Sequence, residues 1–146
     1  MAVEFNGYKI EPGANLRRAD LAGAVLVGVN LAGANLEESD LVGANLSHVR
    51  LSHAFLGGVL LEGANLRRAN LIHAKLKRAN LLRVNLLGAD LRWANLKRAG
   101  LEGANLSGAD LVGAKLRWTN LTGAICDRNT VWPPGFDPTA AGVIID

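Results

Sequence analysis

The sequence predicts an all-β solenoid, a fold in which short strands stack through backbone hydrogen bonds into a rod. Three observations in its 146 residues indicate this fold. Leucine occupies every fifth position from Leu16 to Leu121, which makes 22 consecutive occurrences. The position two residues before each leucine holds 16 alanines and 4 valines, with Ser39 and Thr119 as the remaining two. The position directly before each leucine is Asn or Asp in 15 of the 22 repeats.

A period of five excludes the two simpler secondary structures. On an α-helix each step of five residues turns by about 500°, so the leucines would spiral over every face. In a continuous strand the side chains alternate with period two, so successive leucines would point to opposite faces. The pattern instead places Ala and Leu inside across an Ala-x-Leu step and then requires a bend. A bend every five residues gives coils that stack at the ~4.8 Å spacing of neighbouring strands.

The tandem motif A(N/D)LXX, which covers residues 14–126, resembles the pentapeptide repeat family. That resemblance implies a right-handed quadrilateral β-helix with four pentapeptides per coil, and therefore about 5–6 coils in this chain. The stretch from Thr130 to Gly142, TVWPPGFDPTAAG, is similar to the tails of cyanobacterial members.

Residues 1–13 precede the repeat and are expected to form an N-terminal cap. The segment breaks the period of five but carries Val3, Phe5, Tyr8 and Ile10. A solenoid end exposes strand edges and an open core, which must be covered. These four side chains are expected to plug the first coil.

Within residues 14–126 each repeat position has an expected role. The leucines fill the axis, alanine leaves room beside them, and the Asn and Asp side chains hydrogen-bond to turn backbone. Glycine occupies 11 of the 22 positions two residues after the leucine. Because Arg18 and Trp93 occupy equivalent positions, glycine there is interpreted as leaving the face unobstructed rather than as supplying a positive φ.

Residues 127–146 are expected to form a C-terminal cap. Cys126 and Val131 should continue the leucine register weakly before the repeat ends. Asp137 followed by Pro138 predicts the start of a short helix, which Gly142 can end. The side chains expected to cover the last coil are Trp132, Phe136, Val143, Ile144 and Ile145. The same apolar end could instead form an end-to-end dimer, so monomer and dimer both stay open.

Composition excludes several classes of protein. The single Cys126 rules out a disulfide framework and a cysteine-based zinc cluster. No run approaches 18 consecutive apolar residues, and the start MAVEFNGYKI lacks the features of an export signal. The sequence therefore predicts a soluble, cytoplasmic protein with no membrane partner.

The sequence predicts neither an active site, a cofactor nor a metal site. Ser47-His48 and Ser52-His53 place hydroxyl beside imidazole, but no third group orients them and a filled rod has no concavity. His53 and His73 lie 20 residues apart and should stack one coil apart. Trp93 follows them in the same column rather than a third metal ligand, so an exposed pair is favoured over a metal site.

Charge is unevenly distributed along the chain. Residues 1–64 have a net charge of −3, residues 65–120 of +8, and residues 121–146 of −2. Folded onto a 20-residue coil, seven cations share one face of three consecutive coils. Trp118 ends this stripe, and Trp93 is expected on a neighbouring face beside Arg92. The candidate interaction surface consists of Lys75, Lys77, Arg78, Lys97, Arg98, Lys115, Arg117, Trp93 and Trp118.

Nearer the N-terminus of the same face, Arg17 and Arg18 should pair with Glu37 and Glu38, whereas the stripe has no such partners. This surface supports three functional hypotheses, beside a purely solvating role for the charge. The first is a non-catalytic scaffold that binds another protein. The second is binding of nucleic acid or another polyanion, with a tryptophan stacking on bases. The third, implied by the family resemblance, is a DNA mimic that interacts with a topoisomerase, which the basic surface disfavours.

Overall fold

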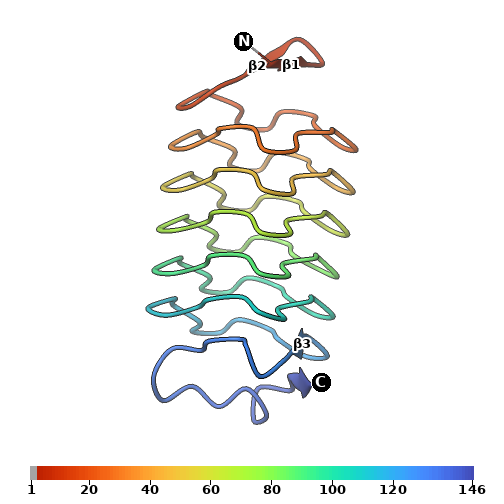
Figure 1. Ribbon diagram of the computed structural model, residues 1–146. Helices are drawn as coiled ribbons and strands as arrows, with labels where there is room; N and C mark the ends of the chain where they lie inside the picture. Colours follow the sequence, from red (N-terminus) through yellow and green to blue (C-terminus); the bar gives the residue numbers. More distant parts are fainter. Residues whose placement is uncertain (1–2) are drawn as a thin grey trace.

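The computed structural model describes residues 3–146 as a rod of stacked coils with the two termini at opposite ends (Figure 1). From Asn15 to Asn105, each residue directly before a repeat leucine pairs in parallel with the residue 20 positions further on, as Lys75 does with Asn95. The Leu76 N–H donates to the Asn95 carbonyl at 2.8 Å, and the Lys75 N–H donates to the Ala54 carbonyl at 2.9 Å. Four pentapeptides therefore complete one coil, as the resemblance to the pentapeptide repeat family implies.

The leucines fill the axis of the rod. From Leu16 to Leu111 every leucine of the repeat is at most 2% exposed, and so is Leu121. Leu116 is only half-buried, because the regular pairing ends at Val131 and no complete coil covers it. Ser39, in an alanine position, is fully buried, and its hydroxyl donates to the Leu36 carbonyl at 2.7 Å. Burying a leucine contributes about 1.5–3 kcal/mol, so this column is the main stabilising element.

Every pentapeptide turns through a left-handed residue. All 22 positions two residues after a repeat leucine have positive φ, from 53° at Arg83 to 73° at Gly113. The N–H of the next residue closes the bend on the leucine carbonyl, as Ala79 does on Leu76 at 3.0 Å. A positive φ at the third residue of such a turn is the signature of type II geometry. The interpretation that glycine only leaves the face unobstructed is therefore wrong: the backbone requires this conformation, and eleven non-glycine residues adopt it at an energetic cost.

The Asn and Asp residues before the leucines cap these turns, as predicted. Their side-chain oxygen accepts the N–H two residues on, for example Asn35 from Glu37 at 3.0 Å and Asp110 from Val112 at 3.0 Å. Seven repeats lack this cap because another residue takes the position: Val25, Arg50, Phe55, Leu60, Lys75, Gly100 and Lys115.

The N-terminal end is closed by a hairpin of β1 (Val3–Phe5) and β2 (Tyr8–Ile10), which pair antiparallel. Ile10 is 4% exposed, and Phe5 and Tyr8 pack half-buried against the core, whereas Val3 is exposed. Three of the four predicted plug residues thus contact the core. Residues 1–2 of the predicted cap lie outside the described residues, and the division at residues 13 and 126 stays a prediction.

The leucine register ends at Cys126, which is 2% exposed in β3 (Ile125–Cys126). Leu106 donates its N–H to Ile125, 19 residues on, but Leu111 donates to Val131, 20 residues on. One additional residue therefore enters the coil between 127 and 130. Val131 consequently lies in the outward position, 45% exposed, so its predicted place in the leucine register is wrong.

The predicted C-terminal helix is also wrong: residues 138–142 form turns, and residues 3–146 contain no helix. The Asp137 carboxylate accepts the Ala140 N–H at 3.2 Å, as a helix cap would. By residue 144, however, the chain has returned to the rod as β4 (Ile144–Ile145), which pairs in parallel with β3. Six residues, 138–143, separate the cap from the strand, and the first five of them form turns.

The last coil is covered by only part of the predicted set. Trp132 and Phe136 stack with ring centroids 5.0 Å apart and pack against the core, and Val143 is 6% exposed. Ile144 and Ile145 are 57% and 59% exposed, so their predicted role as a cover is wrong. In the described part of the chain no helix could cross a membrane.

Candidate interaction surface

One side of the rod carries the predicted interaction surface. We call it the basic side and define it as residues 53–58, 73–78, 93–98 and 113–118, which stack as four successive rungs. The Arg78 N–H donates to the Lys97 carbonyl at 3.0 Å, and the Arg98 N–H donates to the Arg117 carbonyl at 3.1 Å. Lys75, Asn95 and Lys115 pair in one column. The seven predicted cations and Trp118 are thereby brought together on this side.

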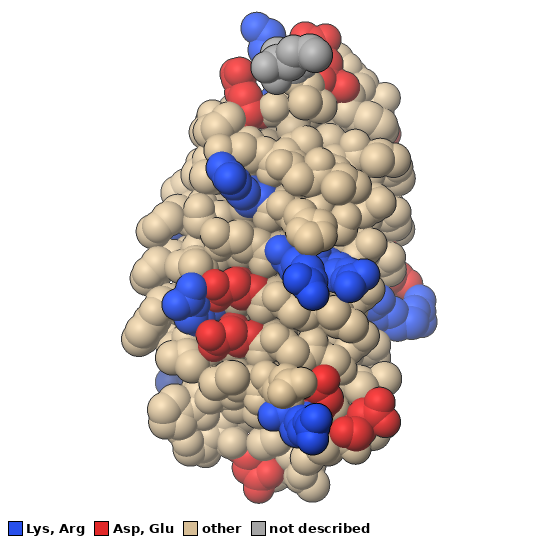
Figure 2. Space-filling view, in the orientation of Figure 1, with Lys and Arg blue, Asp and Glu red and all other residues tan. Residues whose placement is uncertain are grey.

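The cations of the basic side have no acidic partner. Ion pairs within the described residues join Arg17 and Arg18 to Glu38, Arg83 to Glu62, and Arg92 to Asp90 and Asp110. None of them includes a cation of the predicted stripe. Neighbouring like charges about 5 Å apart repel by roughly 1 kcal/mol in water, so the stripe costs stability. The face of the rod that is seen in Figure 2 carries separate groups of basic and acidic side chains on a mostly uncharged surface.

Near the N-terminus of the same side the ion pairing differs in detail from the prediction. Both arginines reach Glu38, with Arg17 at 3.0 Å and Arg18 at 3.6 Å, so a pairing with Glu37 is wrong. The Arg17 hydrogen bond, with Arg18 nearby, lowers the pKa of Glu38. The Glu37 carboxylate instead lies against Gly57 of the next rung.

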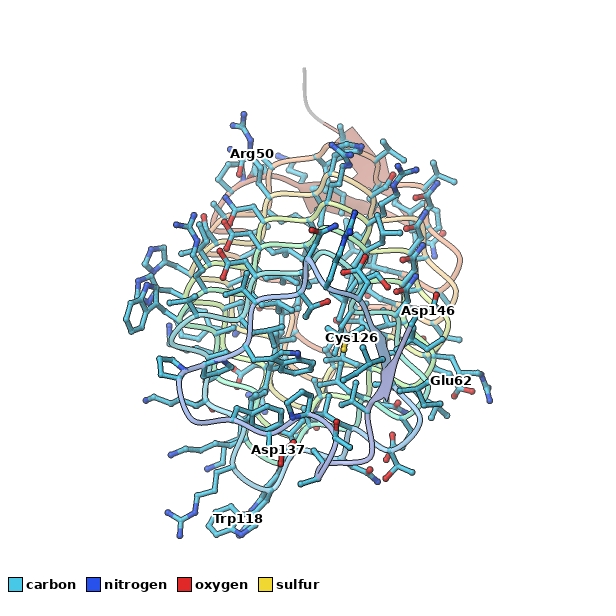
Figure 3. The ribbon with its side chains drawn as sticks, turned by 60° about the horizontal axis from the view of Figure 1, so that its bottom comes forward. Arg50, Glu62, Trp118, Cys126, Asp137 and Asp146 are labelled. Carbon is cyan, nitrogen blue, oxygen red and sulfur yellow. The ribbon has the colours of Figure 1, made fainter. Side chains whose placement is uncertain are left out.

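Trp118 holds two of the cations in place. The guanidinium carbons of Arg117 and Arg98 lie 4.2 Å and 4.8 Å from the centroid of its ring. The indole projects outward from the rod, whereas Cys126 lies within the coil (Figure 3). Cation–π contacts of this kind contribute about 0.5–1 kcal/mol at exposed sites. They orient guanidinium groups whose hydrogen-bond donors stay available.

A second feature, an aromatic ladder, runs along the corner of the basic side. The rings of His53 and His73 stack with centroids 4.9 Å apart, and those of His73 and Trp93 follow at 6.4 Å. The stacking of the two histidines one coil apart is as predicted. Placing Trp93 on a separate, neighbouring side is wrong, because its ring lines the same groove as the lysines. The sequence gives the corner position but not the direction of the ring.

The ladder and the lysines enclose a groove of about 420 Å³. Its lining residues are Glu37, His53, Phe55, Gly57, His73, Ala74, Lys75, Lys77, Trp93, Asn95 and Lys115. Aromatic rings lie at the corner, and the ammonium groups come from positions further along each rung. The groove thus has an aromatic wall at the corner and, across from it, a basic wall in which Phe55 shares the column of Lys75 and Lys115.

Several repeats that line the groove lack the Asn or Asp that caps the turn elsewhere in the rod. Three of the seven repeats that lack an Asn or Asp cap are those of Phe55, Lys75 and Lys115, which share one column of the groove with Asn95. The Lys75 ammonium lies 4.4 Å from the centroid of the Phe55 ring. A turn-capping hydrogen bond contributes about 0.5–1.5 kcal/mol net. The groove therefore gives up stability at three positions, a common property of functional sites.

The residues considered for catalysis and metal binding show no assembled site. No hydrogen bond joins Ser47 to His48 or Ser52 to His53 in the described chain. Residues 3–146 contain no cluster of three His, Cys, Asp or Glu side chains able to hold a metal ion. Burial raises the pKa of the Cys126 thiol, which favours its unreactive protonated form.

Sequence reasoning missed the groove residues Glu37, Phe55 and Gly57, and it considered His53 and His73 as an exposed pair or a metal site but not as part of a groove. A signal was available: aligning the sequence in blocks of 20 places Phe55, Lys75 and Lys115 in one column normally filled by Asn. What the alignment could not show is that the aromatic column faces the basic one.

Comparison with known proteins identifies the repeat. The pattern "Pentapeptide repeats" matches residues 14–52, 44–81 and 85–123. The chain is similar to the pentapeptide repeat protein Rfr23 from the cyanobacterium Cyanothece 51142, with 38% identity and a TM-score of 0.76 over 77% of this chain and 90% of that one. It is also similar to trypsin-treated QnrB1 (R167E), a plasmid-mediated fluoroquinolone resistance protein, with 20% identity and a TM-score of 0.72 over 92% and 78%. At 20% identity this second likeness shows the fold alone, the right-handed quadrilateral β-helix. A search of curated proteins finds no match.

Proposed function

The chain belongs to the pentapeptide repeat family, and we propose that it is a non-catalytic scaffold that binds an acidic partner protein through the basic side. One observation carries this proposal: seven cations stack on one side of a rigid rod without a carboxylate partner among the described residues. A surface with such uncompensated repulsion becomes more stable when an acidic surface covers it.

The rigidity of the rod supports a role as a scaffold. Backbone hydrogen bonds of 2.7–3.1 Å join successive rungs on the basic side, and Leu56, Leu76 and Leu96 behind them are fully buried. The outward side chains are therefore held at fixed spacing, and little backbone entropy is lost when a partner binds.

Binding of nucleic acid or another polyanion is the second candidate, and it is supported by the same stack of cations. Base stacking, however, requires a free aromatic face. The Trp93 ring packs between His73 and Gly113, and the guanidinium groups of Arg98 and Arg117 cover Trp118. Stacking a base would displace these contacts, which favours a protein partner. If nucleic acid is the partner, affinity will fall steeply with added salt and free nucleic acid will compete with the protein partner.

The other functions considered receive less support. A DNA mimic directed at a topoisomerase requires an acidic surface, which the basic side does not provide. An end-to-end dimer would use Ile144 and Ile145, which lie exposed at the C-terminal end. A cytoplasmic location and the absence of catalysis are parts of the same proposal.

Affinity capture from native lysate tests the proposal. The wild-type protein is compared with a variant that reverses the charge of Lys77, Arg78, Lys97 and Arg98. The matched control reverses four cations that lie elsewhere on the rod: Arg50, Arg67, Arg68 and Arg128. We expect a partner that the wild type and the control both capture and the stripe variant loses. Capture that is unchanged in the stripe variant would exclude the basic side as the binding surface.

A further inference from the structure

We propose that the groove on the basic side binds an extended segment of the partner in which acidic residues alternate with apolar ones. The inference rests on the proposed function and specifies its ligand. It is carried by the juxtaposition of an aromatic wall, formed by His53, His73 and Trp93, with a basic wall formed by Lys75, Lys77 and Lys115.

The two walls are chemically unlike and lie on opposite sides of one axis. Along a rung, His73 lies at the corner and is followed by Lys75 and then Lys77, so the rings and ammonium groups are separated across the rung. One rung on, Trp93 is followed by Asn95 and Lys97, of which only Asn95 lines the groove. A ligand that runs along the rod axis thus meets aromatic rings on one flank and the ammonium groups of Lys75, Lys77 and Lys115 on the other.

An extended chain meets this condition because its successive side chains point in opposite directions. Acidic side chains at alternate positions would face Lys75, Lys77 and Lys115, and the apolar side chains between them would face the ring ladder. A helix repeats about every 3.6 residues, so its acidic and apolar positions would not follow the period of two that the extended segment requires. The groove is therefore expected to recognise the pattern of the segment as well as its charge.

The length of the groove sets the length of the segment. Its lining extends over four rung steps, from Glu37 to Lys115. At ~4.8 Å per step this is roughly 19 Å, which an extended chain covers with about six residues. Glu37 is the one carboxylate of the lining, so the first position beside it should be uncharged or basic.

Two hexapeptides of equal composition and charge provide a direct test. One alternates, Leu-Glu-Leu-Glu-Leu-Glu, and the other is blocked, Leu-Leu-Leu-Glu-Glu-Glu; each carries the same neutral fluorophore for anisotropy measurements on the full chain. We expect the alternating peptide to bind at least tenfold more tightly. Equal affinity of the two peptides would overturn the inference while leaving the basic side as an acidic-partner surface.

Variants then locate the bound peptide. Trp93→Gly should weaken the alternating peptide about fivefold or more, whereas the matched Trp118→Gly should leave it unchanged. Both tryptophans are exposed and have positive φ, so glycine fits the backbone at either position. Only Trp93 lines the groove. An equal loss from both variants, or no loss from Trp93→Gly, would contradict groove binding.

The charged wall is tested separately. Replacing both Lys75 and Lys115 by Gln should weaken the alternating peptide at least tenfold, and Glu37→Gln should tighten it. Arg67→Gln, on another side of the rod, is the control and should have no effect. If neither peptide binds wild-type protein, the groove inference is wrong, and lysate capture still decides the proposed function independently.

Discussion

The indole ring of Trp93 lies over Gly113, one coil further along the chain, and fills the space that a β-carbon at residue 113 would occupy. The absence of a side chain at Gly113 thus allows the aromatic ladder to end on a flat platform. Trp93 in turn lines the groove that we propose as the binding site. The identity of a glycine in one coil therefore fixes the position of a groove residue in the coil before it.

Gly113→Ala should accordingly displace the Trp93 ring. At any of the positive-φ glycines an alanine costs about 1–2 kcal/mol through backbone strain. Gly23→Ala is the matched control, because its β-carbon would meet no atom within 4 Å. We expect Gly113→Ala to lower the free energy of unfolding by more than Gly23→Ala and to shift tryptophan fluorescence. Equal destabilisation, with fluorescence unchanged in both, would show that the ring does not rest on residue 113.

Restoring the missing turn caps in the groove should stabilise the protein and impair binding. In Lys75→Asn and Lys115→Asn the new side chain can accept the N–H two residues on, which is worth about 0.5–1.5 kcal/mol per site. Each change also removes a cation of the basic wall. We expect a higher urea midpoint together with weaker capture of the acidic partner.

Leu60→Asn provides the control for this trade-off. It adds the same cap at an exposed position outside the groove. It should raise the urea midpoint without changing capture of the partner. If the lysine variants are stabilised but bind normally, the groove lysines have no role in recognition.

Glycine should stabilise the rod wherever a larger residue has positive φ. His48 has a φ of 58° and is exposed. In His48→Gly, relief of about 1–2 kcal/mol of strain exceeds the unfolded-chain entropy that glycine adds, about 0.4–1 kcal/mol. Urea unfolding should therefore show a net gain of up to about 1 kcal/mol. Ser47→Gly, at the preceding residue without positive φ, should show the opposite sign.

Position along the rod should determine the cost of core truncation. Leu76 is fully buried between complete coils, whereas Leu116 is half-buried at the last one. Leu76→Ala should cost about 2–5 kcal/mol because the surrounding rungs cannot collapse into the cavity. Leu116→Ala should cost clearly less. Thermal and urea unfolding of the pair measure the difference, and equal costs would mean that the last coil is as well packed as the middle of the rod.

The ion pair of Asp90 and Arg92 should make stability depend on pH in the acid range. Hydrogen bonds from the Arg92 guanidinium, one of them 2.7 Å long, lower the pKa of Asp90. The unfolded chain then takes up a proton at higher pH than the folded one, so this contribution is complete above the unfolded pKa and is lost as pH falls through the folded pKa.

In Arg92→Gln the free energy of unfolding should therefore fall less steeply than in the wild type as the pH is lowered from 5 to 2.5. Because Asp90 is partly exposed, the difference should be at most about 1 kcal/mol. The urea midpoint as a function of pH is the measurement, with Arg67→Gln as a control that removes an arginine without an ion pair. An identical acid slope in wild type and Arg92→Gln would contradict a folded-state pair.

The sequence by itself determined the bend every five residues and the composition of the basic side. Five-residue spacing of leucine is a local property that excludes a continuous helix or strand, and the 20-residue coil that the family resemblance implies then places Lys77 beneath Lys97. The caps formed by Asn and Asp follow equally, because they join residues two apart.

Only the tertiary structure decided features that depend on the neighbouring coil. Trp93 turns into the groove because Gly113 offers an open platform, a relation between residues 20 apart in the chain. Val131 leaves the leucine register because an additional residue enters the coil after Cys126. The expected helix is replaced by turns and β4, because pairing with β3 brings the chain back to the rod. The direction of a side chain, and the strand register at the end of the rod, depend on the residues of the neighbouring coil. The local sequence pattern does not encode those contacts.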